Sequence, residues 1–340
     1  MTRAFVTGGS GFVGRNVIRA LRGAGWKVVA AARSDAAARA VAAAGAEPVP
    51  ADLSGPAALA AGMAGCDLVV HAAAKVEPWG ARAEFHRVNV AGTENVLAAA
   101  RSAGVPRLVH VGTEAVLADG RPIVNADESR PLPPRPRGAY AVTKALAEAR
   151  VLAASGPALE TMVVRPRFVW GRDDTSLLPK MVDAARRGTL AWISGGRYLT
   201  STCHVANAAH GVRLAAERGR AGGVYFLTDG PPIEFRAFVT ALLATQGLEA
   251  PARAVPRWLA RGLGAALEAV WPERAAHPPP ITRTLLAVMG VEVTVDDARA
   301  RRELGYREVV TRAQGMEELA RAAASGAGPA AATPRARPRG

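Results

Sequence analysis

The segment Tyr140-Ala141-Val142-Thr143-Lys144 places a phenol and an ammonium group four residues apart. On a helix this spacing puts both side chains on the same face. A lysine cation held near a tyrosine hydroxyl favours the phenolate, so it lowers the tyrosine pKa from its free value of about 10. Such a pair suits general acid–base chemistry on a hydroxyl or carbonyl group. Tyr and Lys are also common on solvated helix faces, so the pair alone does not distinguish a catalytic site from such a face. The rest of the sequence has to decide between them.

A glycine-rich turn near the start of the chain has the residue types that dinucleotide binding needs. Thr7-Gly8-Gly9-Ser10-Gly11-Phe12-Val13-Gly14 follows a short apolar segment and opens a helical one. Glycines permit the tight turn, let backbone N–H groups approach a pyrophosphate and allow close packing of helix on strand. This context favours a binding site over a Gly-rich turn without a ligand. We predict that the cofactor is bound by Gly8, Gly11, Phe12, Val13 and Gly14.

The end of the second expected strand bears on the choice of cofactor. A chain that binds the adenosine ribose through its 2′-hydroxyl offers Asp or Glu there. Here the strand ends Ala30-Ala31-Ala32-Arg33-Ser34, and Arg33 with Ser34 would suit a 2′-phosphate. This favours NADP(H) over NAD, with an ordinary surface arginine as the alternative. Asp52 and Leu53 are placed to meet the adenine, and a helix-capping role for Asp52 or Ser54 is the alternative.

The first half of the chain alternates short apolar runs with Ala-rich helical stretches. This order is typical of βαβ units in a parallel sheet. We expect strands at residues 4–7, 27–31, 47–49, 68–71, 107–111, 160–164 and, later, 224–227. We expect helices at residues 11–22, 36–43, 56–63, 83–103 and 139–154. The predicted fold is α/β, a Rossmann doubly wound parallel sheet with a smaller C-terminal substrate-binding or lid region.

After Arg165 the regular alternation of short apolar runs and helical stretches ends. Helices are expected at residues 177–187, 205–218 and 235–246, and an apolar helix at 256–271 precedes three consecutive prolines. Irregular segments that are interrupted by prolines are typical of substrate-facing or lid structure. For the apolar helix, burial in the core and peripheral contact with a membrane are the alternatives. We expect a Rossmann domain at 1–170 that includes the Tyr/Lys helix, a substrate-binding region at 171–324 interleaved with late Rossmann elements, and a disordered tail at 325–340.

The composition excludes several classes of protein. The chain has 340 residues and is 49% hydrophobic, which is enough to bury a large core. Its formal net charge is +14. Only four of its 43 basic residues are lysines, and the arginines are scattered among alanines, so we expect no nucleic-acid partner. No apolar run approaches the about 20 residues of a membrane span, and the first residues read as a strand, so we expect a cytoplasmic protein. Cys66 and Cys203 lie far apart, which predicts neither a disulfide framework nor a metal site.

In their joint order, several motifs resemble the extended short-chain dehydrogenases/reductases. The matching pieces are the turn at 7–14, Asp52-Leu53, the segments at 71–74, 89–97 and 111–113, the Tyr140/Lys144 pair, and the segments at 165–171 and 204–210. Together they cover about three quarters of the chain. Segments 75–80, 225–230 and 297–306 are most similar to the 3β-hydroxysteroid dehydrogenase branch, which includes bacterial 2-alkyl-3-oxoalkanoate reductases. Sugar-nucleotide epimerases and dehydratases share the catalytic motifs.

The resemblance implies a role for each candidate residue. Tyr140 would donate a proton when a ketone is reduced, Lys144 would bind the nicotinamide ribose and keep the Tyr140 pKa low, and Thr113 would hydrogen-bond the substrate oxygen. Ala72, Ala73, Ala74, Pro166 and Val169 would flank the cofactor together with His71. Asn89 would organise a water near the lysine, or make an ordinary polar contact. His204 and His210 would be structural or pocket-lining. The candidate substrate contacts are Lys75, Trp79, Glu114 and Arg167, and for Glu114 exposure to solvent is the alternative.

The resulting expectation is an NADP(H)-dependent oxidoreductase that interconverts a ketone and a secondary alcohol on an apolar, sterol-like or long 3-oxoacyl substrate. A nucleotide-sugar epimerase or reductase is the second enzymatic hypothesis. A non-catalytic NADP-sensing protein is the alternative from another class. The family resemblance also makes a homodimer possible, through helices near 83–103 and 139–154.

Overall fold

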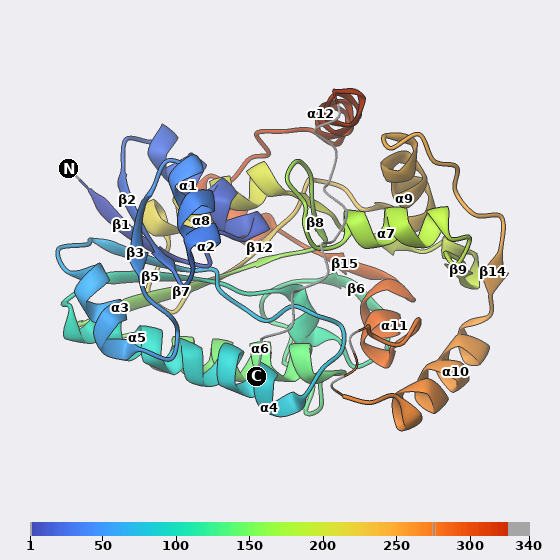
Figure 1. Ribbon diagram of the computed structural model, residues 1–340, viewed down its shortest axis with the longest axis horizontal. Helices are drawn as coiled ribbons and strands as arrows, with labels where there is room; N and C mark the ends of the chain where they lie inside the picture. Colours follow the sequence, from blue (N-terminus) through green and yellow to red (C-terminus); the bar gives the residue numbers. More distant parts are fainter. Residues whose placement is uncertain (1, 274, 276, 326–340) are drawn as a thin grey trace.

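Seven parallel strands form the central sheet of the computed structural model, which describes residues 2–273, 275 and 277–325 (Figure 1). Across the sheet they are β12 (Val224–Leu227), β7 (Glu160–Pro166), β5 (Arg107–Val111), β4 (Leu68–His71), β1 (Arg3–Thr7), β2 (Lys27–Ala32) and β3 (Glu47–Pro50). The chain order reverses between β1 and β4, and ligands of such sheets bind outside the carboxyl ends of the strands at this point. The predicted doubly wound α/β fold is confirmed.

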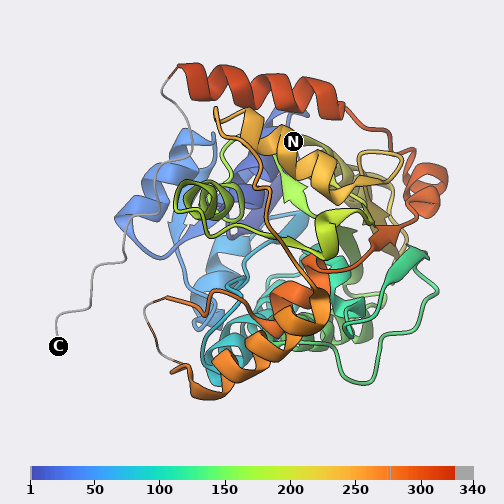
Figure 2. The ribbon, with the colours of Figure 1, turned by 90° about the vertical axis from the view of Figure 1, so that its right-hand side faces the viewer.

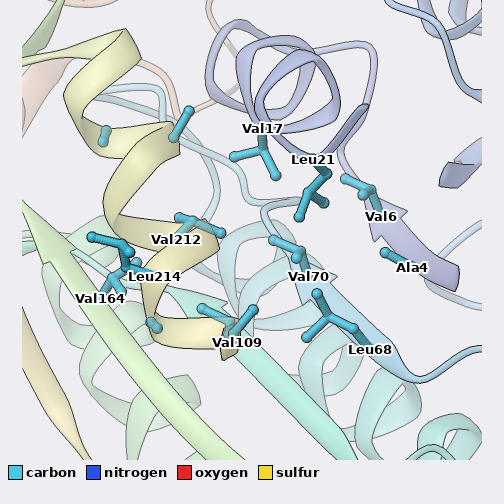
Figure 3. Packing of buried hydrophobic residues seen from close by; sticks show 14 of the residues in the cluster. Ala4, Val6, Val17, Leu21, Leu68, Val70, Val109, Val164, Val212 and Leu214 are labelled. Atoms are coloured by element: carbon cyan, nitrogen blue, oxygen red, sulfur yellow. The ribbon is translucent and has the colours of Figure 1, made fainter. Parts of the chain in front are cut away.

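Helices cover both faces of this sheet (Figure 1). One face carries α1 (Phe12–Gly23), α2 (Asp35–Ala43) and α8 (Val205–Arg218), and the other carries α3 (Pro56–Met63), α5 (Gly92–Ser102) and α6 (Ala139–Ala153). Figure 3 shows Val17 and Leu21 of α1 and Val212 of α8 packed over Val70 and Val109 of the strands. Each such side chain stabilises the fold by about 1.5–3 kcal/mol when fully buried. The sheet is therefore a rigid base for the residues at its carboxyl edge.

The helix expected at residues 83–103 has a more complex structure. It consists of α4 (Arg82–Phe85), a π-helical segment (His86–Ala91) and α5, which follow one another without a break. Single π-helical turns inside α-helices are frequent at functional sites. Here the segment buries Asn89, whose side-chain amide contacts the chain that follows β4.

A second, smaller sheet lies beside the first and was not predicted. Its strands are β13 (Ile233–Glu234), β10 (Leu199–Thr200), β15 (Val293–Val295) and β6 (Ile123–Ala126). A separate aromatic core lies between α7 (Leu178–Arg186) and α9 (Phe235–Ala244). It contains Phe168, Trp170 and Trp192 together with Phe235 and Phe238 of α9. Strand β12 comes after α7 in the chain and yet pairs with β7 in the large sheet. The late chain thus returns to the Rossmann sheet.

The expected apolar helix is α10 (Arg257–Val270), and it lies on the outside of the molecule beside α11 (Arg283–Met289). In Figure 2, α10 lies at the bottom and α12 (Arg312–Ala324) at the top. Trp258 is 75% exposed and Val270 is 77% exposed, and Leu259 and Leu263 are exposed as well. For these four side chains the core alternative is wrong.

No helix in the described part of the chain has both the length and the apolar character needed to cross a membrane. Cys66 and Cys203 are both buried free thiols. Apart from Ser325, the expected disordered tail at 325–340 lies outside the described residues.

Candidate active site

The glycine turn and the chain after β4 touch at the carboxyl edge of the sheet. Gly8 has a φ of +71°, and a Cβ atom there would lie 2.6 Å from the backbone nitrogen of Ala73. A Cβ atom on Gly14 would lie 2.1 Å from the carbonyl oxygen of Gly8. Gly11 precedes α1 without a side-chain cap, and the first turn contains no acidic residue. The first N–H groups of α1 therefore fit the pyrophosphate of a dinucleotide.

The residues expected near the adenosine lie where β2 and β3 end. Ser34 caps α2, since its hydroxyl accepts a hydrogen bond from the backbone of Ala37 at 3.3 Å, and Arg33 is exposed. The carboxylate of Asp52 accepts hydrogen bonds from the backbone and hydroxyl groups of Ser54. These bonds lower the Asp52 pKa, and the charges of Arg33 and Arg87 lower it further. Sequence reasoning missed Arg87, which the π-helical segment carries to this edge.

Leu53 and the residues after β4 have packing roles as well. Leu53 lies against the start of α5, where a Cβ atom on Gly92 would be 2.9 Å from its Cδ1 atom. His71 is fixed by Thr7, 2.7 Å from its Nδ1, and by Thr93, 2.9 Å from its Nε2. Burial lowers the His71 pKa to about 3, so this ring is neutral at physiological pH. The side chains of Ala72, Ala73 and Ala74 are half-buried beside the glycine turn.

Thr113, Tyr140 and Lys144 come together beyond the carboxyl end of β5. Thr113 caps a short 3-10 helix (Glu114–Leu117), with its hydroxyl oxygen 3.2 Å from the backbone nitrogen of Ala115. Tyr140 lies in the first turn of α6, and Lys144 follows one turn later on the same face. The Thr113 hydroxyl lies beside the phenol of Tyr140 and favours its ionised form. The structure thus brings the three candidate catalytic residues together.

The environment of Tyr140 corrects one expectation. Its pKa is raised above the ordinary value, first by burial and then by the negative charge of Glu114, and Thr113 opposes this shift only in part. Lys144 is not among the groups that shift this pKa. The Lys144 Nζ atom donates to the carbonyl oxygen of Val111 at 2.8 Å and lies 2.9 Å from the Nε2 atom of His110. A phenol in this environment stays protonated at neutral pH.

Lys144 is only 2% exposed, and burial lowers its pKa to about 8, while the charge of Glu148 acts in the opposite direction. Glu148 itself forms a buried ion pair with Arg165 of β7. Sequence reasoning missed this pair and His110. The only available signal was the presence of polar residues within otherwise apolar, parallel strands.

Glu114 and Arg167 form a second buried ion pair, in which the Arg167 Nη1 and Glu114 Oε1 atoms are 2.7 Å apart. The second carboxylate oxygen of Glu114 accepts a hydrogen bond from the Thr113 hydroxyl at 3.0 Å. Arg167 also donates to Thr200 of β10 and to the carbonyl oxygen of Val288 in α11. Glu114 does not face solvent, so that alternative is wrong. The pair links the Thr113 hydroxyl to the second sheet and to α11.

The loop at residues 75–80 is held on two sides. The Lys75 Nζ atom lies 3.2 Å from carboxylate oxygens of both Glu77 and Glu84, and the Trp79 indole donates to the carbonyl oxygen of Pro272. Asn89 binds the backbone N–H and C=O groups of Lys75 and also donates to Thr143 of α6. For Asn89 the structure therefore shows polar contacts between protein groups.

The remaining candidates lie at the end of β7, in the small sheet formed by β8 and β11, and on α8. Pro166 ends β7, and Val169 begins β8 (Val169–Trp170), which pairs with β11 (Cys203–His204). His204 is buried and caps α8, with its Nδ1 atom 3.3 Å from the backbone nitrogen of Ala206. His210 is half-buried on α8, where its ring lies against Tyr306. The contacts of both histidines are structural.

Comparison with known proteins shows the family to which the chain belongs. Residues 5–257 match the family model described as the 3-beta hydroxysteroid dehydrogenase/isomerase family. The chain belongs to this family. As a member it is an oxidoreductase of the extended short-chain dehydrogenase/reductase type, as the motifs predicted.

Two curated relatives of this family member match it over nearly their whole lengths. A 4-hydroxy-2-methyl-3-oxo-4-farnesyl-3,4-dihydroquinoline-1-oxide ketoreductase from Stigmatella aurantiaca is 53% identical over 329 residues, which are 96% of this chain and 98% of that protein. A 2-alkyl-3-oxoalkanoate reductase from Stenotrophomonas maltophilia is 36% identical, over 93% of this chain and 98% of that protein. Among solved structures, a dTDP-glucose 4,6-dehydratase double mutant from Streptomyces venezuelae with NAD bound is 25% identical. It has a TM-score of 0.72 and covers 94% of this chain and 96% of its own.

Proposed function

We propose that this protein is an NADP(H)-dependent ketoreductase that reduces a ketone to a secondary alcohol on an apolar substrate, with Tyr140 as the proton donor. The observation that carries the proposal is the convergence of Thr113, Tyr140 and Lys144 at the carboxyl end of β5, on the same edge of the sheet as the glycine turn that follows β1. A hydroxyl, a phenol and an ammonium group around one oxygen atom can stabilise developing alkoxide charge.

In the proposed reaction Thr113, Tyr140 and Lys144 have different roles. The substrate oxygen would lie between the hydroxyls of Thr113 and Tyr140, with the Thr113 hydrogen turned from Glu114 to that oxygen. Tyr140 would transfer its phenolic proton to the same oxygen. The phenol carries its proton at physiological pH, as a proton donor must, while burial and the charge of Glu114 raise its pKa and so hold the proton more tightly. Lys144 would hold the nicotinamide ribose with its ammonium group. When bound, the nicotinamide supplies the hydride. The names of the two relatives, a ketoreductase and a 2-alkyl-3-oxoalkanoate reductase, support reduction as the working direction.

The preference for NADP(H) rests on charge at the ends of β2 and β3. Arg33 is exposed there, and both Arg33 and Arg87 act on the carboxylate of Asp52. Two guanidinium groups at this edge suit a 2′-phosphate, which is bound most strongly by charge-assisted hydrogen bonds. The bound NAD of the dehydratase structure supports a nicotinamide dinucleotide as the cofactor class. Arg33 and Arg87 support the phosphorylated form.

The apolar substrate class is supported by the relatives and by the exposed face of α10. The names of the two relatives describe a farnesylated quinoline ketone and a 2-alkyl-3-oxoalkanoate. The exposed side chains of Trp258, Leu259, Leu263 and Val270 lie on a helix that packs against α11, which in turn receives the hydrogen bond from Arg167.

Lys75 and Trp79 remain candidate substrate contacts. Glu114 and Arg167 form an ion pair with each other. We therefore propose that they orient the Thr113 hydroxyl, which donates to Glu114, and do not contact the substrate themselves. Homodimerisation and peripheral membrane contact stay predictions.

A nucleotide-sugar activity is the second candidate, because the dehydratase is among the structural neighbours. Glu114 follows the catalytic threonine directly, but it is already paired with Arg167 and is followed by Ala115. The test is a panel of 3-oxoacyl compounds, sterol ketones and UDP-sugars, with NADPH oxidation followed by absorbance and sugar conversion followed by chromatography. We expect NADPH oxidation with apolar ketones and no change in the sugars. Conversion of a UDP-sugar without reduction of any apolar ketone would overturn the proposal.

A further inference from the structure

A buried histidine makes direct contact with the lysine of the site. His110 is the fourth residue of β5, and the Nε2 atom of its ring lies 2.9 Å from the Lys144 Nζ atom. The exposed fraction is 1% for His110 and 2% for Lys144. The next residue along the strand, Val111, accepts a second hydrogen bond from Nζ at 2.8 Å. We propose that His110 is a positioning residue that, together with the Val111 carbonyl, fixes the Lys144 ammonium and leaves its remaining N–H for the nicotinamide ribose.

The direction of the hydrogen bond follows from the charges of the two groups. Burial, together with the positive charge of Lys144, holds the His110 pKa well below its usual value, so the ring is neutral. An ammonium group can only donate, so the Nε2 atom must accept and the ring hydrogen must lie on Nδ1. The Nδ1 atom has no hydrogen-bond partner among the described residues. The strand therefore keeps a buried polar group at a cost that an apolar side chain would avoid, and the contact with Lys144 accounts for its presence.

The groups around this contact fix both partners. The His71 ring lies against His110, with ring centroids 5.1 Å apart, and is itself held by Thr7 and Thr93. Glu148, one turn beyond Lys144 on α6, is turned into its ion pair with Arg165. Tyr140 lies one turn before Lys144 on the same helix. These are the titratable and charged groups that β4, β7 and α6 bring near the ammonium.

A neutral acceptor has an advantage over a carboxylate at this position. A carboxylate within hydrogen-bond distance would cancel much of the ammonium charge inside the protein, where such interactions are strong. Imidazole stabilises the cation by one hydrogen bond and leaves its net charge available to a ligand. The inference rests on the proposed role of Lys144 in cofactor binding, and it assigns a function to a residue that this reaction does not otherwise use.

The experiment compares His110→Phe, which removes the acceptor, with His110→Gln, which places an amide oxygen near the former Nε2 position. His210→Phe is the matched control, because His210 lies on α8 and does not contact Lys144. The dissociation constants of NADPH and NADH are measured by fluorescence titration between pH 6 and pH 9.5. For His110→Phe we expect about fivefold weaker binding at pH 8 and a loss of binding at a pH about one unit lower than in the wild type. His110→Gln and His210→Phe should stay close to the wild type.

The inference is overturned if His110→Phe and the wild type share one pH profile, or if His110→Gln is as impaired as His110→Phe. His110→Leu provides a second apolar replacement if the phenylalanine variant does not fold. A second readout, the pH dependence of urea unfolding without nucleotide, reports on Lys144 even if no nucleotide binds. There the increase in stability above neutral pH should begin at lower pH in the apolar variants, and an unchanged onset would also overturn the inference. Neither readout needs turnover, so failure of the ketone panel alone would refute the proposed reaction and leave this inference standing.

Discussion

Replacing Lys144 with methionine should change how the stability of the protein depends on pH. Burial lowers the Lys144 pKa from 10.5 to about 8 in the folded state. The folded protein therefore holds this proton less tightly than the unfolded chain does. The resulting cost is fully present below pH 8, and it is relieved as the pH rises from about 8 towards 10.5. The methionine variant carries no such cost at any pH.

The magnitude follows from the size of the pKa shift. The difference between 10.5 and about 8 corresponds to about 3 kcal/mol of destabilisation at pH 7, and about 1 kcal/mol of it is left at pH 10. The wild type should therefore gain about 2–3 kcal/mol relative to Lys144→Met between pH 7 and pH 10. The variant also loses the hydrogen bonds to His110 and Val111. That loss displaces the whole curve by a constant amount, so the change with pH is the tested quantity.

The assay is urea unfolding of both proteins at pH 7, 8, 9 and 10, read by circular dichroism. Lys180→Met is the matched control, because Lys180 is an exposed lysine on α7. Its stability difference from the wild type should be flat over this range. If the difference between the wild type and Lys144→Met were equally flat, the reasoning about a buried and destabilised ammonium would be refuted.

Three further predictions concern the glycine turn, the phosphate site and a buried ion pair. Gly14→Ala places a methyl group 2.1 Å from a carbonyl oxygen of the turn, so it should cost about 1–3 kcal/mol in urea unfolding and weaken NADPH binding. Gly23→Ala on the same helix meets no atom within 4 Å and should stabilise the protein by up to about 1 kcal/mol, and equal effects would contradict this account. Arg33→Ala should weaken NADPH binding about tenfold and leave NADH binding unchanged, and a parallel loss in both titrations would remove the phosphate assignment. Glu148→Gln leaves the charge of Arg165 buried and unpaired, so unfolding should show a loss of about 3–5 kcal/mol, and a loss below about 1 kcal/mol would contradict the burial of the pair.

The central sheet and its helices could be predicted because their signals are local. Most strands of the large sheet are short apolar runs, and helices such as α1 have a clear amphipathic pattern. The second sheet has no such signal. Its strands are two to four residues long, and Ile123 of β6 pairs with Val293 of β15, far away in the chain. Short strands that depend on distant partners leave little trace in a sequence.

The positions of Thr113, Tyr140 and Lys144 also followed from the sequence, because each lies at a fixed place relative to a strand or helix end. Their electrostatic environment did not. The upward shift of the Tyr140 pKa depends on the burial of the phenol and on the charge of Glu114. The contact between Lys144 and His110 depends on the packing of α6 over β5. Both require side-chain geometry across different elements, which residue spacing along the chain does not provide.

The proton transfer from Tyr140 can be measured directly by comparing Tyr140→Phe with the wild type. Both proteins would be supplied with NADPH and the best apolar ketone of the panel, and NADPH oxidation would be followed at saturating concentrations. The account predicts a fall in kcat of about 10²–10⁴-fold with an unchanged NADPH dissociation constant, because only the acid is removed. A Tyr140→Phe enzyme that reduces the ketone at the wild-type rate would contradict the central claim.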